Sequence, residues 1–131
     1  MPKAELHELI TKHLGVPKTH IVCEYGMSEL SSQAYDHTIA DCRLQIADCP
    51  PTEASRVFRF PSWARAQIVS PETGQPVNEG EVGLIRVFDL ANVRSVLALE
   101  TEDLGVWRGD GLELIGRAAL AEPRGCSLMA P

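Results

Sequence analysis

The chain has 131 residues, a length that suits one domain able to bury a hydrophobic core. Its hydrophobic fraction of 44% is ordinary for a globular protein and excludes wholesale disorder. The net charge is -6 and lysines occur only at Lys3, Lys12 and Lys18, which argues against binding to nucleic acid or to an anionic membrane.

The amino-terminal segment 1–15 carries charges throughout and lacks the apolar stretch of a secretory signal. No apolar run approaches the roughly 20 residues needed to cross a bilayer. We therefore predict a cytoplasmic protein, in which cysteines are mostly reduced thiols. The four cysteines are irregularly spaced, which disfavours a disulfide framework; they are Cys23, Cys42, Cys49 and Cys126.

The first elements along the chain are a predicted helix and a predicted strand. Apolar residues at helical spacing indicate a helix over residues 2–14, with Gly15 as its carboxyl-terminal stop. The β-prone run 20–24 follows, and a glycine turn with polar residues comes directly after it. This order is typical of the edge of an α/β sheet, where ligands bind beyond the carboxyl ends of strands.

The second half of the chain has a different pattern. Residues 36–56 show no period and are predicted to form a long loop, and residues from 121 onward form a tail without a pattern. Short strands are predicted between them, and Asp110-Gly111 indicates a hairpin. The expected strands are 57–60, 63–69, 83–88, 94–99, 106–107 and 112–115. The fold class is therefore α+β: a helix and strand from an α/β sheet, then a small antiparallel, β-barrel-like subdomain.

Four sequence motifs occur in a characteristic order. The segment Glu24–Leu30 resembles a Tyr-Gly-x-Thr/Ser-Glu motif, and the run from Val69 to Gly83 contains a Pro-Glu-Thr-Gly turn followed by Glu-Gly-Glu-Val-Gly. The segment Glu100–Gly105 resembles a Thr-Glu-Asp motif, and Leu114–Arg117 resembles a Gly-Arg hinge. In this order they resemble the adenylate-forming superfamily of acyl-activating enzymes.

Two further segments resemble one family within that superfamily, the acyl-protein synthetases of bacterial luminescence fatty-acid reductase. These segments are Ser31–Asp36 and Arg124–Leu128. The resemblance implies that residues 1–131 are one partial adenylating domain, the carboxyl-terminal portion of it, divided into 1–35, 36–56, 57–120 and 121–131. It also implies ATP or AMP and Mg²⁺ as cofactors, and a fatty or other carboxylic acid as substrate.

The resemblance assigns a role to each matching residue. It implies that Tyr25, next to Gly26, stacks on adenine, as suits an aromatic face. It implies that Ser28 donates a hydrogen bond near the acyl carbonyl and that Glu29 helps to hold Mg²⁺, a cation that prefers carboxylate oxygen. In the remaining motifs, Asp103 would accept hydrogen bonds from the ribose hydroxyls, and Arg117 would bind ribose or phosphate. Each of these residues has a simpler alternative, as a surface ion-pair partner or a partly buried sheet residue.

The Arg124–Leu128 segment implies a second kind of catalytic residue. Cys126 would capture the activated acyl group as a thioester, which requires a thiolate able to reach the acyl-adenylate. The neighbouring Arg124 would favour that anion. The alternative is a tail thiol without a role.

The chain also departs from the family pattern. Nothing in it resembles the Ser/Thr/Gly-rich phosphate loop, whose N–H groups and hydroxyls hold ATP phosphates, or the lid with its catalytic lysine. The usual hinge Asp is replaced by Ala119 or Leu120. We therefore expect the isolated chain to be inactive and to need an amino-terminal half or a partner subunit. Exposed sheet edges would favour a homodimer.

Two other functions stay open at this point. One is a non-catalytic remnant or partner subunit of the same fold. The other is a small metal-stabilised interaction module built on His37, Cys42 and Cys49, although zinc sites usually contain closer cysteine pairs. The other histidines, at positions 7, 13 and 20, are expected at a surface or interface, and Trp63 and Trp107 are expected to anchor the core.

Overall fold

The computed structural model describes residues 1–38 and 56–118. They form one α-helix and one antiparallel sheet of seven strands, so the α+β prediction is confirmed. The order of elements is α1 (Lys3–Leu14), a 3₁₀ turn (Lys18–His20), β1 (Glu24–Tyr25), β2 (Ala34–Thr38), β3 (Arg56–Arg59), β4 (Ala64–Val69), β5 (Val82–Asp89), β6 (Ala98–Arg108) and β7 (Gly111–Arg117).

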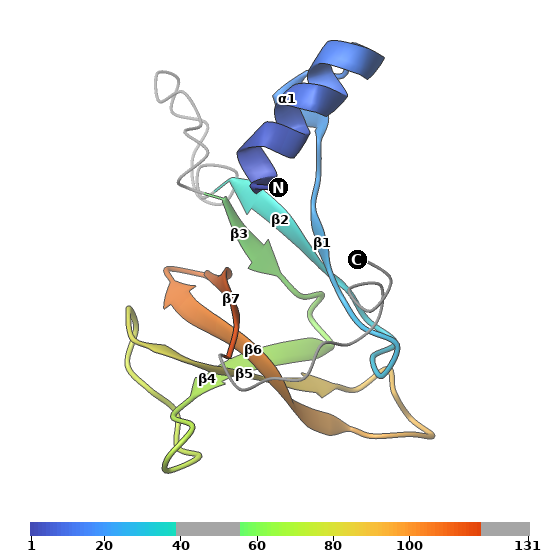
Figure 1. Ribbon diagram of the computed structural model, residues 1–131. Coiled ribbons are helices and arrows are strands. Elements are labelled where there is room, and N and C mark those ends of the chain that lie inside the picture. The colour runs from blue at the N-terminus through green and yellow to red at the C-terminus, as the bar shows by residue number, and fades with distance from the viewer. Residues whose placement is uncertain (39–55, 119–131) are drawn as a thin grey trace, which may run out of the picture.

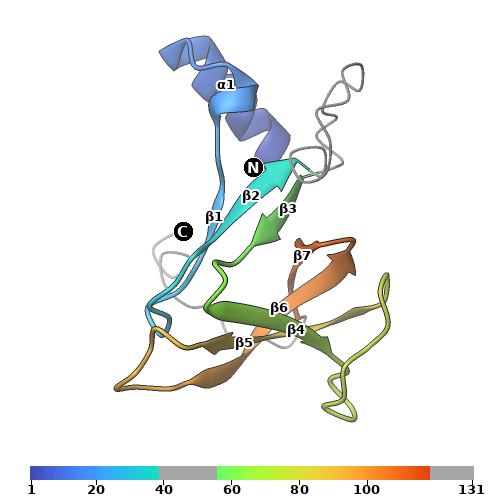
Figure 2. The same cartoon turned by 180° about the vertical axis from the view of Figure 1, so that it is seen from behind.

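The sheet has the strand order β1-β2-β3-β7-β6-β5-β4, and every pairing is antiparallel. It is open, with β1 and β4 at its edges. Only Phe58 and Leu112 are paired between β3 and β7, so the sheet divides into a three-stranded part and a four-stranded part. Figures 1 and 2 show β1, β2 and β3 reaching toward α1, while β4 to β7 form the opposite end of the molecule.

The hydrophobic core lies where these two parts meet. Strand β5 alternates regularly, with Ile85 and Val87 fully buried. Leu112 from β7 and Phe58 from β3 are buried beside them. The strand expected at 83–88 is therefore present, and it extends from Val82 to Asp89.

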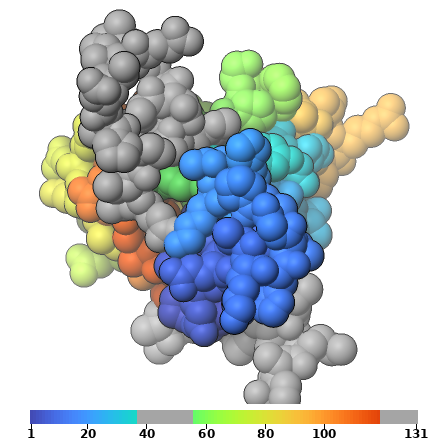
Figure 3. Space-filling view, turned by 90° about the horizontal axis from the view of Figure 1, so that it is seen from above, coloured from blue at the N-terminus to red at the C-terminus, as the bar shows by residue number. Residues whose placement is uncertain are grey.

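Helix α1 ends as the sequence predicts, because Gly15 adopts a left-handed conformation with φ of 69° and its N–H donates to the Thr11 carbonyl. Its apolar side chains are not buried: Leu6 and Leu14 are 42% and 72% exposed. The helix is instead attached through polar groups, since His7 is buried within hydrogen-bond distance of the Cys23 sulfur. Figure 3 shows α1 at the end of the molecule nearest the viewer.

Several predicted boundaries need correction. The expected strand at 20–24 begins only at Glu24, because Lys18–His20 forms a 3₁₀ turn. Asp36–Thr38, expected in a loop, belongs to β2. The strand expected at 94–99 starts at Ala98 and runs to Arg108, where the predicted hairpin turns back into β7. The rest of the 36–56 loop and the tail beyond 121 lie outside the described residues.

Close strand packing gives a first testable prediction. A Cβ atom at Gly83 would overlap the Val69 carbonyl oxygen of the neighbouring strand. Gly83→Ala is therefore expected to lower the free energy of unfolding by about 1–3 kcal/mol, as measured by urea denaturation. Val82→Ala, next to it but 53% exposed, is the control and should change stability by less than about 0.5 kcal/mol. Equal stability of the two variants would contradict the prediction.

Candidate functional site

Three residues from separate motifs meet on one side of the sheet. Tyr25 ends β1, Asp103 lies in β6 and Arg117 ends β7. The Tyr25 hydroxyl donates to Asp103 Oδ2 at 2.9 Å, across 78 positions of sequence. Arg117 Nε lies 3.5 Å from Asp103 Oδ1. The structure thus brings together the residues expected to contact adenine, ribose and phosphate.

Asp103 is fixed by its own strand. Its backbone N–H donates to Thr101 Oγ1 at 3.1 Å, and that hydroxyl donates to the Ile85 carbonyl at 2.9 Å. The Asp103 side chain is 20% exposed. A carboxylate offers about four lone-pair sites, and Tyr25 and Arg117 occupy only part of them. The remaining sites suit a ligand that presents hydroxyl donors.

Arg117 adds a cation at the edge of this cluster. Its Nη2 donates to Glu102 Oε2 at 2.9 Å, and its side chain is 38% exposed. Arginine carries five N–H donors in a planar fork. Nε and Nη2 face the two carboxylates, and the rest of the fork is suited to phosphate or ribose oxygens.

Tyr25 differs from the expected stacking platform. Its ring is 7% exposed and packs against Phe58 and Phe60, with ring centroids at 6.0 and 6.3 Å. Burial, followed by the nearby Asp103 charge, raises the pKa of the Tyr25 hydroxyl above its usual range, although Thr101 and Arg117 act in the opposite direction. The hydroxyl is therefore a neutral donor to Asp103 at physiological pH. Stacking on adenine would require the ring to become uncovered.

The turn between β1 and β2 carries Gly26, Ser28 and Glu29. Both Ser28 and Glu29 are exposed, and the Ser28 hydroxyl donates to Glu29 Oε2 at 3.1 Å. The side-chain amide of Asn92 donates to the Glu29 carbonyl at 2.7 Å, which anchors this turn to the segment after β5. Glu29 thus presents an exposed carboxylate, of the type that binds a hard cation, with Ser28 at one of its oxygens.

A second anchor of this turn was not evident from the sequence. The Asp89 carboxylate is fully buried at the end of β5 and accepts hydrogen bonds from the backbone N–H groups of Ser31 and Ser32. The Ser32 hydroxyl also donates to it, and in turn accepts from Trp63 Nε1.

Trp63 is 53% exposed, so the expectation that it anchors the core is wrong, whereas Trp107 does pack against the core.

The remaining predicted site residues have varied outcomes. Cys126, Cys42 and Cys49 lie outside the described residues, and for His37 only the backbone in β2 is described. Among residues 1–38 and 56–118, no group of three or more His, Cys, Asp or Glu side chains is arranged to hold a metal ion. The same part of the chain contains no helix long and apolar enough to cross a membrane.

Comparison with known proteins adds independent information. No family model matches the chain. A long-chain-fatty-acid–luciferin-component ligase of Aliivibrio fischeri is 29% identical over 77 residues, which cover 52% of this chain and 20% of the ligase. The luciferase-like enzyme of the nonluminescent mealworm Zophobas morio aligns in structure with a TM-score of 0.57 and 21% identity. That alignment covers 90% of this chain and 30% of the enzyme.

These comparisons support the sequence resemblance at a coarse level. The chain spans well under half the length of either protein. It shares its fold with part of the luciferase-like enzyme and is similar in sequence to part of a fatty-acid ligase. The sequence similarity fits a portion of a fatty-acid ligase, and the structural similarity shows a shared fold.

Proposed function

We propose that this chain supplies the ribose- and metal-binding side of an ATP-dependent acyl-activating enzyme. Such an enzyme joins a carboxylate to the α-phosphate of ATP, with pyrophosphate as the leaving group. The single observation that supports this most strongly is the convergence of Tyr25, Asp103 and Arg117. A sequence similarity to a fatty-acid ligase supports the choice of a fatty or other carboxylic acid as substrate.

The residues would act mainly by positioning and by charge. Asp103 accepts hydrogen bonds from the two ribose hydroxyls, and Arg117 neutralises ribose or phosphate oxygens. Tyr25 holds Asp103 in place through its hydroxyl and would stack on adenine only if its ring is uncovered. Ser28 donates to the acyl carbonyl or the α-phosphate.

The cofactor and the acceptor follow from the same proposal. Magnesium is usually bound by one or two carboxylates together with substrate phosphates, so Glu29 needs only the nucleotide to complete a site. Bound Mg²⁺ would neutralise charge on the transferring phosphate. Cys126 is the proposed thiol acceptor of the acyl group, within the acyl-protein synthetase type of reaction. We infer a cytoplasmic enzyme.

Nucleotide binding by the chain is the decisive test. AMP is expected to bind, and the analogue that lacks both ribose hydroxyls is expected to bind far more weakly, as measured by isothermal titration calorimetry. Asp103→Asn should weaken AMP binding by about tenfold to a hundredfold, since hydrogen bonds to charged groups contribute about 1.5–3 kcal/mol.

The matched control is Glu100→Gln in the same strand, whose carboxylate pairs with Arg86. It should leave AMP binding within about twofold, because exposed ion pairs contribute little. Absence of AMP binding to the unmodified chain, or equal binding of AMP and the hydroxyl-free analogue, would contradict the proposed function. That result would favour the non-catalytic alternative.

A further inference from the structure

A cavity of about 200 Å³ lies between the first two turns of α1 and the start of β3. Figures 1 and 2 show the amino-terminal end of α1 beside the end of β2 and the start of β3. The lining residues are Lys3, Ala4, His7 and Arg56. A water molecule occupies about 30 Å³ of the liquid, whereas sites for drug-sized ligands measure roughly 300–1,000 Å³. The volume therefore suits a small ion with a few water molecules better than a nucleotide.

The wall of this cavity carries an excess of positive charge. Lys3 and Arg56 are both cationic, and both pair with the buried Asp36 carboxylate, at 2.7 and 2.9 Å. Two positive charges against one negative charge leave a net charge of +1 on these three side chains. Glu5, the acidic residue in the first turn of α1, does not line the cavity. An anion placed there would meet a favourable potential.

Both cations retain hydrogen-bonding capacity beyond Asp36. A lysine ammonium has three N–H donors, and Lys3 Nζ uses one of them on Asp36 Oδ2 while it lies 5.5 Å from the centre of the Phe58 ring. Arg56 donates to Asp36 through Nη2, but its Nε is buried and has no hydrogen-bond partner within the described part of the chain. A partly paired guanidinium that is only 13% exposed is destabilising, and a second anion beside it would offset part of that cost.

His7 adds a buried ring to the same wall. The residue is 3% exposed and lines the cavity. Its Nε2 lies 3.4 Å from Cys23 Sγ, so a thiol proton donated to Nε2 leaves the ring N–H on Nδ1. In that tautomer the imidazole is a third donor group beside the two cations.

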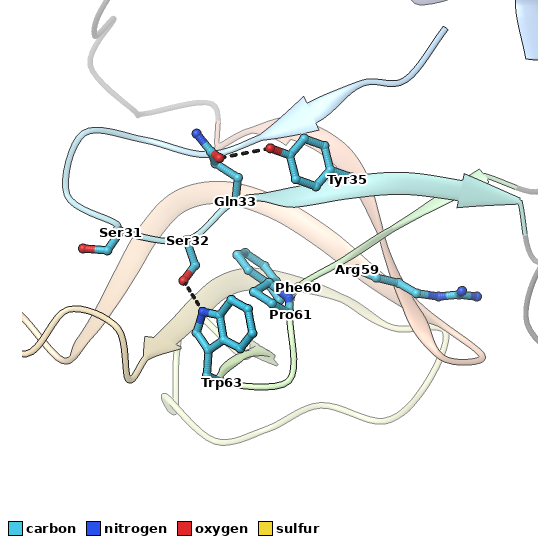
Figure 4. Close-up of a pocket in the computed structure, with 8 residues that line it drawn as sticks. All are labelled: Ser31, Ser32, Gln33, Tyr35, Arg59, Phe60, Pro61 and Trp63. Carbon is cyan, nitrogen blue, oxygen red and sulfur yellow. Dashed lines mark hydrogen bonds between the residues drawn. The ribbon is translucent and has the colours of Figure 1, made fainter. Parts of the chain in front are cut away.

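A second cavity shows that this concentration of donors is not a general feature of the molecule. It measures about 420 Å³ and lies between the start of β2 and the segment joining β3 to β4 (Figure 4). Among its lining residues the cation is Arg59, whose guanidinium extends away from the aromatic rings (Figure 4) and donates to Asp110 at 2.7 Å. The smaller cavity is therefore the better candidate for an anion.

We propose that the cavity between α1 and β3 binds a small tetrahedral oxyanion of the phosphate or sulfate class. The oxygens of such an ion would accept hydrogen bonds from Lys3 and His7 of α1 and neutralise Arg56 of β3, which would fasten the helix to the sheet. None of the residues assigned to the nucleotide lines this cavity. The inference therefore does not rest on the proposed function.

Titration with inorganic phosphate tests the site, followed by calorimetry and by phosphorus NMR at constant ionic strength. Saturable binding is expected, and chloride at the same ionic strength should give none. Phosphate should also slow hydrogen exchange of the α1 amides in the unmodified chain, because the ion contacts both α1 and β3. Sulfate should compete with phosphate for the same site.

One variant blocks the cavity without removing any of its donors. Ala4→Glu places a carboxylate in the wall, and a negative charge in the first turn of a helix favours the helix, so the fold should persist. Repulsion between the two anions should weaken phosphate binding at least about tenfold. Leu14→Glu changes the charge equally at a 72% exposed position of the same helix, roughly 15 Å along its axis. That distance exceeds the screening length of about 8 Å, so binding should change by less than about twofold.

The outcomes separate this site from the proposed nucleotide site. Asp103→Asn should leave phosphate binding within about twofold, whereas it should weaken AMP binding. Absence of saturable phosphate binding, or equal losses in Ala4→Glu and Leu14→Glu, would overturn the proposal. A loss in Asp103→Asn as large as in Ala4→Glu would also overturn it, because the ion would then be bound at the nucleotide contacts.

Discussion

Replacing Asp89 with alanine is expected to lower the free energy of unfolding by about 3–5 kcal/mol. Total stability of such a domain is about 5–15 kcal/mol, so the loss is a large part of it. The Asp89 side chain is fully buried and accepts four hydrogen bonds. The substitution leaves three backbone N–H groups and the Ser32 hydroxyl without their acceptor.

The effect should also reach the Trp63 side chain. Ser32 Oγ is the acceptor of the Trp63 indole N–H, so loss of Asp89 frees both side chains. Urea denaturation measures the stability, and Trp63 emission in a Trp107→Phe background reports the local change. Asp110→Ala, which removes a 49% exposed ion-pair partner, is the control and should cost less than about 1 kcal/mol. A loss for Asp89→Ala no larger than for this control would refute the anchoring role.

The sequence predicted correctly those elements that are determined by residues close together in the chain. Gly15 ends α1 because a left-handed conformation costs glycine little. Asp110-Gly111 predicted the hairpin between β6 and β7, and the observed turn is Gly109-Asp110. The strand expected at 83–88 is present as β5, whose inward positions Ile85 and Val87 are apolar. These features depend on neighbours within a few positions.

Strand β2 was missed for a physical reason. Its inward position is occupied by Asp36, and a carboxylate there breaks the apolar alternation that identifies a strand. Its burial is possible only because Lys3 and Arg56, distant in sequence, supply opposite charges. The buried carboxylate of Asp89 likewise interrupts the apolar pattern, so the expected strand 83–88 stops one residue before β5 does.

The candidate site was only partly predictable. Motif resemblance identified Tyr25, Asp103 and Arg117, and the structure brings them into contact. The burial of Tyr25 depends on Phe58 and Phe60, whose placement follows from β3 and not from any motif. Tertiary packing therefore decides between a stacking platform and a positioning hydroxyl.

Replacing Asp36 with alanine is the second change expected to have a large effect. The Asp36 carboxylate is fully buried and accepts hydrogen bonds from Lys3 Nζ and Cys23 N, each at 2.7 Å, and from Arg56 Nη2 at 2.9 Å. It therefore joins α1, the segment before β1, and β3. Arg56 is only 13% exposed and would be left with an uncompensated charge.

The expected loss is about 3–5 kcal/mol of unfolding free energy. It should be accompanied by faster hydrogen exchange in α1, because the Lys3 contact is one of the side-chain contacts that attach this helix to the rest of the described residues. Glu8→Ala, which removes a 70% exposed partner of Lys18 on the same helix, should cost less than about 1 kcal/mol. Replacing the pair together, with Asp36→Leu and Arg56→Met, should restore part of the stability, since no buried charge is then left alone.

Acid titration tests the same network. Burial alone would raise the pKa of Asp36, but the hydrogen bonds from Lys3 and Cys23 N and the charges of Lys3 and Arg56 outweigh it and lower that pKa below its usual value. A carboxyl whose pKa is lower in the folded state stabilises the fold above its unfolded pKa of about 3.9. That contribution is lost as the pH falls through the lowered pKa of the folded state.

The free energy of unfolding of the unmodified chain should therefore decline below about pH 4, and Asp36→Asn should make the decline shallower. An unchanged pH profile in Asp36→Asn would show that this carboxylate is not the group whose ionisation couples α1 to the sheet.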